Sequence, residues 1–142
     1  MMRTLLTLAA GIGVGVAGTT AAQQGARGPA KTIAARDIVE KLDGKEAKAT
    51  AVEVTLEPGR AGAPHRHPGP VLGYVIEGEY EWAIDDNPVR TLKAGDTFYE
   101  PTGCLHRVSK NPSKKGNTRV LAVVLHPHDA KEIAIPAKKD KK

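Results

Sequence analysis

Apolar and polar residues alternate along several short stretches of this chain. In the stretch that starts near Ala47, apolar or small residues occupy every second position from 50 to 56, whereas Glu53 and Thr55 lie between them. Side chains at alternate positions of a strand point to the same side of a sheet. This pattern therefore predicts a half-buried strand that begins near Ala47.

Six further stretches are typical of strands, and turn-forming residues separate most of them. They cover residues 71–77, 80–84, 89–92, 97–99, 105–109 and 120–125. No stretch sustains the 3.6-residue period of an amphipathic helix, and residues 33–42 fit either a short helix or an edge strand. Many short strands with frequent Gly and Pro turns predict an all-β sandwich or barrel, without choosing its topology.

The N-terminus has the pattern of a secretory signal peptide. A short positive start at Arg3 precedes an apolar run over residues 5–18, and Thr20-Ala21-Ala22 resembles a small-residue cleavage site. We therefore expect residues 1–22 to be removed near Ala22 and the mature protein to be periplasmic or secreted. The apolar run is too short and glycine-rich for a good membrane span, so we expect no stable membrane anchoring; an uncleaved anchor is the alternative. Residues 23–46 are interpreted as an N-terminal linker or arm.

Basic residues are in excess and gather at the C-terminus. The chain has 21 Lys and Arg against 16 Asp and Glu, which gives a formal net charge of +5. Residues 131–142 are interpreted as a basic, disordered tail, because terminal runs of this kind are usually solvated. No aromatic residues are interleaved with the charges, so we expect no nucleic-acid partner. The one cysteine, Cys104, allows no disulfide within the chain.

Three histidines are candidate metal ligands. His65 and His67 are two residues apart, so both rings of an extended segment would point to one side. Such a pair alone is weak evidence, because two surface histidines in a loop are common. His106 follows the turn at 101–103 and could bring a third imidazole from a neighbouring strand. Three imidazoles would leave open positions on a metal ion for water or substrate.

Two segments around these histidines resemble the conserved motifs of the cupin superfamily. The segment GRAGAPHRHPGPVLGYVIEG, residues 59–78, matches the first motif at both glycines and at His65 and His67. The segment GDTFYEPTGCLHRVSKN, residues 95–111, matches the second at Gly95, the Pro-x-Gly turn and His106, with its asparagine one place late. The resemblance implies a small single-domain cupin over residues 47–130, folded as a double-stranded β-helix, or jelly-roll barrel. It also implies that the three histidines bind a metal inside the barrel.

One position departs from the cupin pattern. The glutamate ligand of the first motif should fall at Val71, which cannot bind a metal. Three-histidine cupins include cysteine dioxygenase and the diketone-cleaving dioxygenase. The resemblance thus implies a divalent ion, with iron first and Mn, Zn, Ni or Cu as alternatives, in a dioxygenase or oxidoreductase that acts on a small molecule. The alternative is a non-catalytic module that binds a small ligand or a metal.

Further residues are candidates for catalysis or substrate binding near the metal. Glu100, just before the turn of the second motif, is assigned an outer-sphere or acid–base role; a surface carboxylate is the alternative. Gly73 shares the inward face with Val71 and either leaves room for a ligand or relieves packing. Val71, Gly73, Tyr74 and Cys104 are the candidate substrate-binding residues. For Cys104 the competing interpretation is a small buried apolar residue.

The second predicted strand is apolar on both faces. Leu72, Tyr74 and Ile76 alternate with the inward-facing residues, although the outside of a barrel is normally polar. We therefore expect this outer face to be covered, either by residues 33–42 or by a second subunit. Cupins that resemble this chain are often dimers, so we expect a homodimer.

Overall fold

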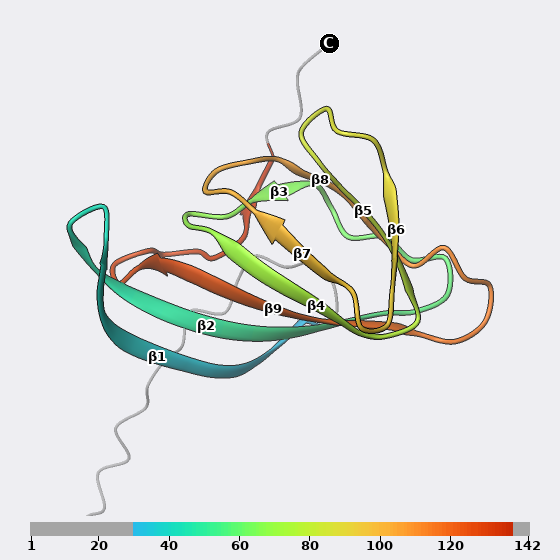
Figure 1. Cartoon of the computed structure of the whole chain (residues 1–142), viewed down its shortest axis with the longest axis horizontal. Helices are drawn as coiled ribbons and strands as arrows, with labels where there is room; N and C mark the ends of the chain where they lie inside the picture. The colour runs from blue at the N-terminus through green and yellow to red at the C-terminus, as the bar shows by residue number, and fades with distance from the viewer. Residues whose placement is uncertain (1–29, 138–142) are drawn as a thin grey trace, which may run out of the picture.

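The part of the chain that the structure describes contains ten β-strands, and Figure 1 shows how they are arranged. The computed structural model covers residues 30–137, apart from the side chains of residues 33, 36 and 38–40. No helix among the described residues is long and apolar enough to cross a membrane. The expected signal peptide, the start of the arm and residues 138–142 lie outside the described residues. The strands are β1 Ala30–Leu42, β2 Lys45–Leu56, β3 His65–Arg66, β4 Val71–Glu77, β5 Glu79–Ile84, β6 Arg90–Lys93, β7 Thr97–Glu100, β8 His106–Lys110, β9 Thr118–Pro127 and β10 Ile135–Pro136.

The strands form two antiparallel sheets that pack as a jelly-roll. One sheet has the order β1-β2-β9-β4-β7 and the other has the order β10-β3-β8-β5-β6. Strands distant in sequence are therefore neighbours: β9 lies between β2 and β4, and β8 lies between β3 and β5 (Figure 1). This architecture confirms the prediction of an all-β double-stranded β-helix.

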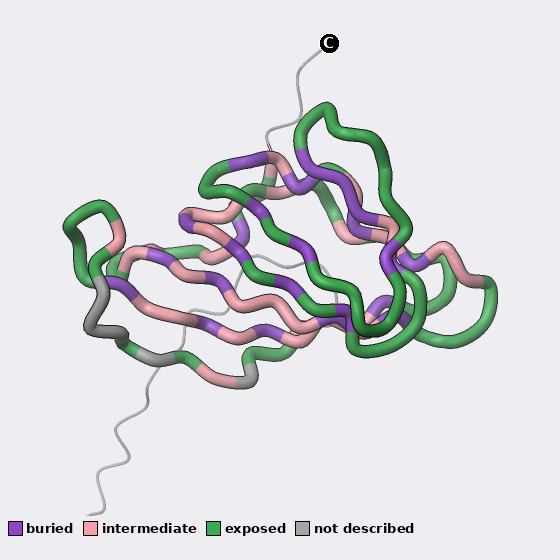
Figure 2. The backbone as a smooth tube through the Cα atoms, viewed as in Figure 1, coloured by how far each residue is buried: buried purple, intermediate pink, exposed green. Residues whose placement is uncertain are grey.

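Alternation along β4 separates the interior of the barrel from its exterior. Val71, Gly73 and Val75 are buried, whereas the residues between them are exposed (Figure 2). The same alternation holds in β7, where Phe98 and Glu100 are buried. The interior is filled by a hydrophobic cluster of Leu56, Val75, Tyr80, Trp82, Ile84, Leu92, Phe98, Cys104 and Val120. Burial of these side chains supplies the main driving force for folding.

The N-terminal segment is an edge strand, which settles the choice left open for residues 33–42. β1 pairs with β2 at the end of the sheet that is remote from β4. It therefore does not cover the outer face of β4 and β7, where Leu72 is 58%, Tyr99 53%, Tyr74 46% and Ile76 36% exposed. The prediction that residues 33–42 cover this face is thus wrong.

The C-terminal segment is ordered further than the sequence suggested. Ile135 and Pro136 form β10 and pair with Arg66 and His65 of β3. The backbone N–H of Ala137 donates to the carbonyl of Pro64 at 3.1 Å. The expectation of a disordered tail therefore does not hold for residues 135–137, because backbone pairing with β3 and Pro64 holds them in place. This segment lies beside the predicted histidine site.

Candidate metal centre

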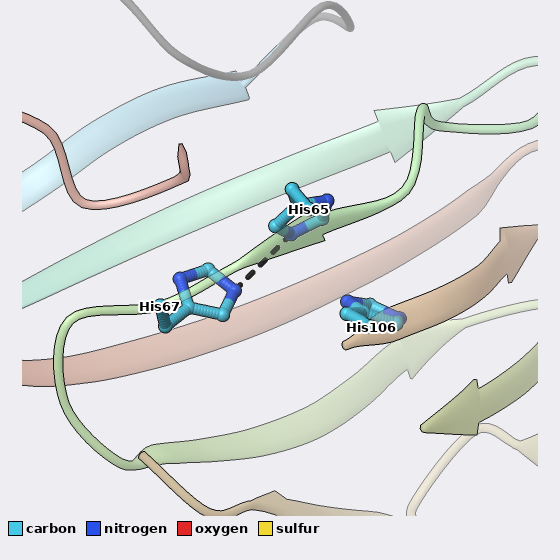
Figure 3. A group of neighbouring side chains, drawn as sticks. All are labelled: His65, His67 and His106. Atoms are coloured by element: carbon cyan, nitrogen blue, oxygen red, sulfur yellow. Dashed lines mark hydrogen bonds between the residues drawn. The ribbon is translucent and has the colours of Figure 1, made fainter. Parts of the chain in front are cut away.

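The fold brings the three histidines together from two neighbouring strands. His65 lies on β3, His67 follows directly after it, and His106 begins β8 (Figure 3). His65 and His106 are paired across the β3–β8 ladder, so their rings leave the sheet side by side. The ring centroid of His65 lies 4.8 Å from that of His67 and 4.9 Å from that of His106. The candidate ligand atoms of this histidine cluster all lie within 4.8 Å of one another.

The unprotonated Nε2 atoms of His65 and His67 face each other. His65 Nδ1 lies 2.8 Å from the carbonyl oxygen of Ala63, and His67 Nδ1 bonds the carbonyl oxygen of Ile133. A carbonyl only accepts, so both Nδ1 atoms must carry the proton. In the neutral rings the two Nε2 lone pairs then face each other at 3.1 Å (dashed line in Figure 3). A cation between them would turn this repulsive contact into a pair of bonds.

Burial keeps the histidine cluster neutral. Desolvation lowers the pKa of His65, and it lowers the pKa of His67 to about 4, helped by the charge of His65. Desolvation, followed by the charges of His65 and His67, lowers the pKa of His106 to about 3. At neutral pH these rings therefore offer lone pairs, which is the state a divalent metal ion requires. The donor set fits a metal of the type that the sequence predicted.

A tyrosine and a serine lie behind His106. Tyr80 Oη donates to Ser109 Oγ at 2.9 Å and lies 3.3 Å from His106 Nε2. Burial raises the pKa of Tyr80, so its hydroxyl stays protonated. Both residues were missed as site residues in the sequence. Their inward position on β5 and β8 was visible from alternation, but their contact with His106 depends on the pairing of these strands.

Glu100 lies inside the site and not on the surface. It ends β7, is 1% exposed and accepts a hydrogen bond at Oε1 from Trp82 Nε1 at 3.0 Å. Its Oε1 is also 3.1 Å from His106 Nδ1, and its Oε2 is 3.5 Å from His67 Nε2. Burial raises the pKa of Glu100 to about 7, although the bond from Trp82 opposes that rise. The surface-carboxylate alternative is therefore wrong, and the contribution of Trp82 was missed in the sequence.

The two candidate positions on the inward face of β4 are closely packed. Val71 is fully buried and pairs across the sheet with Glu100. A Cβ added at Gly73 would lie 2.0 Å from Cζ of Phe98, so the aromatic ring already fills the space above the glycine. Of the two interpretations of Gly73, packing relief fits the structure. The absent side chain admits Phe98 and leaves no room for a ligand there.

Tyr74 and Cys104 lie outside the histidine cluster. Tyr74 faces outward from β4, on the side opposite to Gly73. Cys104 is buried in the hydrophobic cluster, and burial raises the pKa of its thiol to about 11, with the charges of Glu100 and Asp85 adding to the rise. A neutral, buried thiol is unreactive, so the structure favours the interpretation of Cys104 as a small apolar residue.

A hollow on the barrel lies away from the histidines. Its volume is about 640 Å³, and it opens at the β7 edge of the barrel. The hollow is lined both by Trp82 and Phe98, which face the barrel interior, and by residues on the exterior face of β4, β7 and β9. Its lining consists of Leu72, Gly73, Tyr74, Trp82, Arg90, Thr97, Phe98, Tyr99, Leu121 and Val123. None of the three histidines lines this hollow.

Comparison with known proteins gives the same fold. Residues 52–124 match the model of the cupin domain, and no curated protein matches the chain. A conserved protein with a double-stranded β-helix domain from Klebsiella pneumoniae has 27% identity and a TM-score of 0.52, covering 63% of this chain and 76% of that one. A Cupin 2 conserved barrel domain protein from Salinispora arenicola has 20% identity and a TM-score of 0.52, covering 70% and 75%. The DMSP lyase DddQ from Ruegeria pomeroyi has 20% identity and a TM-score of 0.53, covering 66% of this chain but only 45% of its own.

The last two structures, at such low identity, support the fold and nothing beyond it. The family match covers the strands β3 to β8, the end of β2 and most of β9, and includes all three histidines. It also agrees with the two motifs found in the sequence, and with the jelly-roll topology of the two sheets. The chain belongs to the cupin family.

Proposed function

We propose that this protein is an exported, metal-dependent enzyme that oxidises a small organic molecule with dioxygen. The single observation that carries the proposal is the pair of opposed Nε2 atoms of His65 and His67, 3.1 Å apart in neutral rings. His65, His67 and His106 would hold one divalent ion, with iron as the first choice and Mn, Zn, Ni or Cu as alternatives. When bound, such an ion supplies Lewis-acid and redox chemistry to ligands in its open positions.

The residues of the chain give this site one open side. His106 and Glu100 are buried, whereas His65 and His67 are half-buried on the β3 side. A small substrate would therefore approach past β3, while the buried side chains exclude water behind the histidines. Where both oxygen atoms of O₂ enter the substrate and the substrate supplies all four electrons, as in oxidative bond cleavage, no external reductant is required.

A non-catalytic metal- or ligand-binding barrel is the second candidate. The packing of Phe98 on Gly73 favours it, because the barrel interior beside β4 is filled. The hollow of about 640 Å³ lies at the β7 edge and away from the histidines. A module of this kind would bind its metal with the same histidines but turn over no substrate.

Two measurements test the proposal in sequence. Elemental analysis of protein purified without a histidine tag should find about one divalent ion per chain. Oxygen consumption by the iron-loaded protein should then rise with a member of a panel of diketones, thiols and flavonols. Metal binding without turnover of any of these would favour the binding module. Absence of metal would overturn the metal-dependent enzyme and leave a barrel that binds a ligand without a metal.

Export and dimerisation complete the proposal. The signal-peptide pattern of residues 1–22 supports a periplasmic or secreted protein, and mass spectrometry of the mature chain should place its N-terminus near Gln23. The exposed apolar side chains Leu72, Tyr74, Ile76 and Tyr99 support burial of this face by a second copy of the chain. Light scattering of the purified protein should give twice the mass of one chain. Retained Met1 would contradict export, and the mass of one chain would contradict the dimer.

A further inference from the structure

We propose that Glu100 replaces the missing carboxylate ligand of the first cupin motif, so that the metal is held by three histidines and one glutamate. The inference rests on the proposed metal site and deepens it. It assigns to Glu100 a direct bond to the metal through Oε2, in place of the outer-sphere or acid–base role suggested by its position in the sequence.

Strand pairing puts Glu100 in the right place. The glutamate expected by the family should stand at residue 71, and Val71 is paired directly with Glu100 across the β4–β7 ladder. Directly opposed residues of an antiparallel pair project to the same face, with Cα atoms about 4.5–5.5 Å apart. Both side chains are buried on the inner face. A carboxylate that starts from residue 100 therefore reaches the region that one from residue 71 would occupy.

The distances are those of ligands on one ion. Two ligand atoms, each about 2.1 Å from a metal and roughly at right angles or a little wider, lie about 3.0–3.4 Å apart. The Nε2 atoms of His65 and His67 are 3.1 Å apart, which is within this range, and Glu100 Oε2 lies just beyond it at 3.5 Å from His67 Nε2. Glu100 Oε1 is 3.1 Å from His106 Nδ1, so the carboxylate spans the gap between two of the three rings.

One oxygen of Glu100 has no other partner. Among the described residues, Oε2 is the buried side-chain polar atom that makes no hydrogen bond, whereas Oε1 is fixed by Trp82. Burial of a carboxylate oxygen without a partner is costly, and such atoms are rare in folded proteins. A cation at the histidine cluster would satisfy this oxygen, and the bond from Trp82 would hold it in place.

The fourth ligand changes the charge of the site. Three neutral imidazoles leave the full 2+ charge of a divalent ion, whereas an added carboxylate reduces it to 1+. Carboxylate ligands also favour harder ions than an all-imidazole set does. Glu100 would therefore restore the ligand set of the cupin motif from the neighbouring strand, although its sequence position gives no such indication.

Titration with Co²⁺, followed by its visible absorption and by competition with a chelator, tests this inference without any assay of activity. Glu100→Gln should weaken Co²⁺ binding by more than about 100-fold, beyond the 10- to 100-fold range typical of an outer-sphere partner, and should change the Co²⁺ spectrum. Glu79→Gln, which neutralises an exposed glutamate, should leave both unchanged. A Co²⁺ spectrum unchanged by Glu100→Gln, with a loss of affinity below about 10-fold, would overturn the inference.

An exchange of the two paired residues sharpens the test. In Val71→Glu/Glu100→Val the carboxylate moves to the position that the family uses, with the same pair of residue types in the core. The exchange should recover most of the affinity lost in Glu100→Gln; no recovery in a variant that circular dichroism shows to be folded would count against the inference. Failure of the wild-type protein to bind Co²⁺ would overturn the metal centre itself, which distinguishes that failure from an error about Glu100 alone.

Discussion

The histidine site joins two segments that differ in burial and in the way their side chains are held. On the β3 side, His65 and His67 are half-buried, and backbone carbonyls of Ala63 and Ile133 fix their rings. On the β7–β8 side, Glu100 and His106 are buried and contact other side chains. The positions of His65 and His67 therefore depend on the neighbouring loops and on the C-terminal segment. The positions of Glu100 and His106 depend on the packed core.

This difference assigns separate tasks to the two halves. We propose that a small molecule enters from the β3 side, where backbone carbonyls of Ala63 and Ile133 hold the two rings. The β7–β8 side is held by Trp82, Tyr80 and Ser109, so its geometry is fixed when the barrel folds. We expect changes on the buried side to affect stability and metal binding together, and changes on the β3 side to affect metal binding alone.

Removal of a buried ligand should have the largest effect. His106→Ala removes the buried one of the three imidazoles and leaves two possible histidine ligands. The purified protein should therefore retain essentially no bound metal. His128→Ala is the matched control, because His128 is exposed and pairs with Asp37 at 3.4 Å. Elemental analysis of both variants measures the difference. Equal metal content in the two variants would contradict the assignment of His106.

Loss of the C-terminal segment that contacts His67, here called the C-terminal brace (residues 132–137), should have the next largest effect. A chain that ends after Lys131 lacks the carbonyl of Ile133, to which His67 Nδ1 donates, and lacks β10. Metal affinity should fall by about 10- to 100-fold, the range for loss of an outer-sphere partner. A chain that ends after Ala137 keeps the brace and should bind as the full chain does. Co²⁺ titration compares the two, and equal affinities would show that the β3 half does not need the segment.

The hydrogen bond that orients Glu100 should contribute less. Trp82→Phe keeps an aromatic ring but removes the N–H that donates to Oε1. We expect roughly a 10-fold loss of metal affinity, together with a loss of about 1–3 kcal/mol in the free energy of unfolding. Denaturant unfolding and Co²⁺ titration measure these two quantities. Tyr74→Phe on the outer face is the control, and similar behaviour of the two variants would argue against an orienting role for Trp82.

The smallest effect is a pH dependence of the metal-free protein. Burial raises the pKa of Glu100 from 4.5 to about 7, so the folded state holds this proton more tightly than the unfolded chain does. The wild type should therefore lose stability as pH rises from about 4.5 through 7, whereas Glu100→Gln avoids this loss. The stability of the variant relative to the wild type should rise over that range and level off above it. Unfolding curves in the presence of a chelator, at pH 5 and pH 8, give the comparison; a difference that stays constant with pH would contradict it.

The two halves also differ in how far the sequence predicts them. The spacing of His65 and His67 and the turn before His106 are local features, and they made the three histidines candidates. The resemblance of two segments to the cupin motifs then implied that these histidines form one metal site. Alternation along residues 71–76 predicted which side chains of β4 face inward, and it depends only on the period of a strand.

The remaining features depend on strand pairing between distant segments. The position of Glu100 before the motif turn suggested a role beside the metal, but its place opposite Val71 depends on the register between β7 and β4, which no local pattern encodes. Phe98 fills the space over Gly73 for the same reason. The brace from Ile133 requires β10 to pair with β3, although a short segment beside a basic tail resembles a disordered end. Long-range register therefore determined what the sequence could not predict.

Anomalous diffraction from crystals of the Co²⁺-loaded protein, recorded at the cobalt edge, would locate the metal. We expect one peak about 2.0–2.2 Å from Nε2 of His65 and of His67, with Glu100 Oε2 at a similar distance. A peak bound by the histidines but remote from Glu100 would keep the metal centre and reject the fourth ligand. A metal bound elsewhere, or no peak near His65 and His67, would contradict the account as a whole.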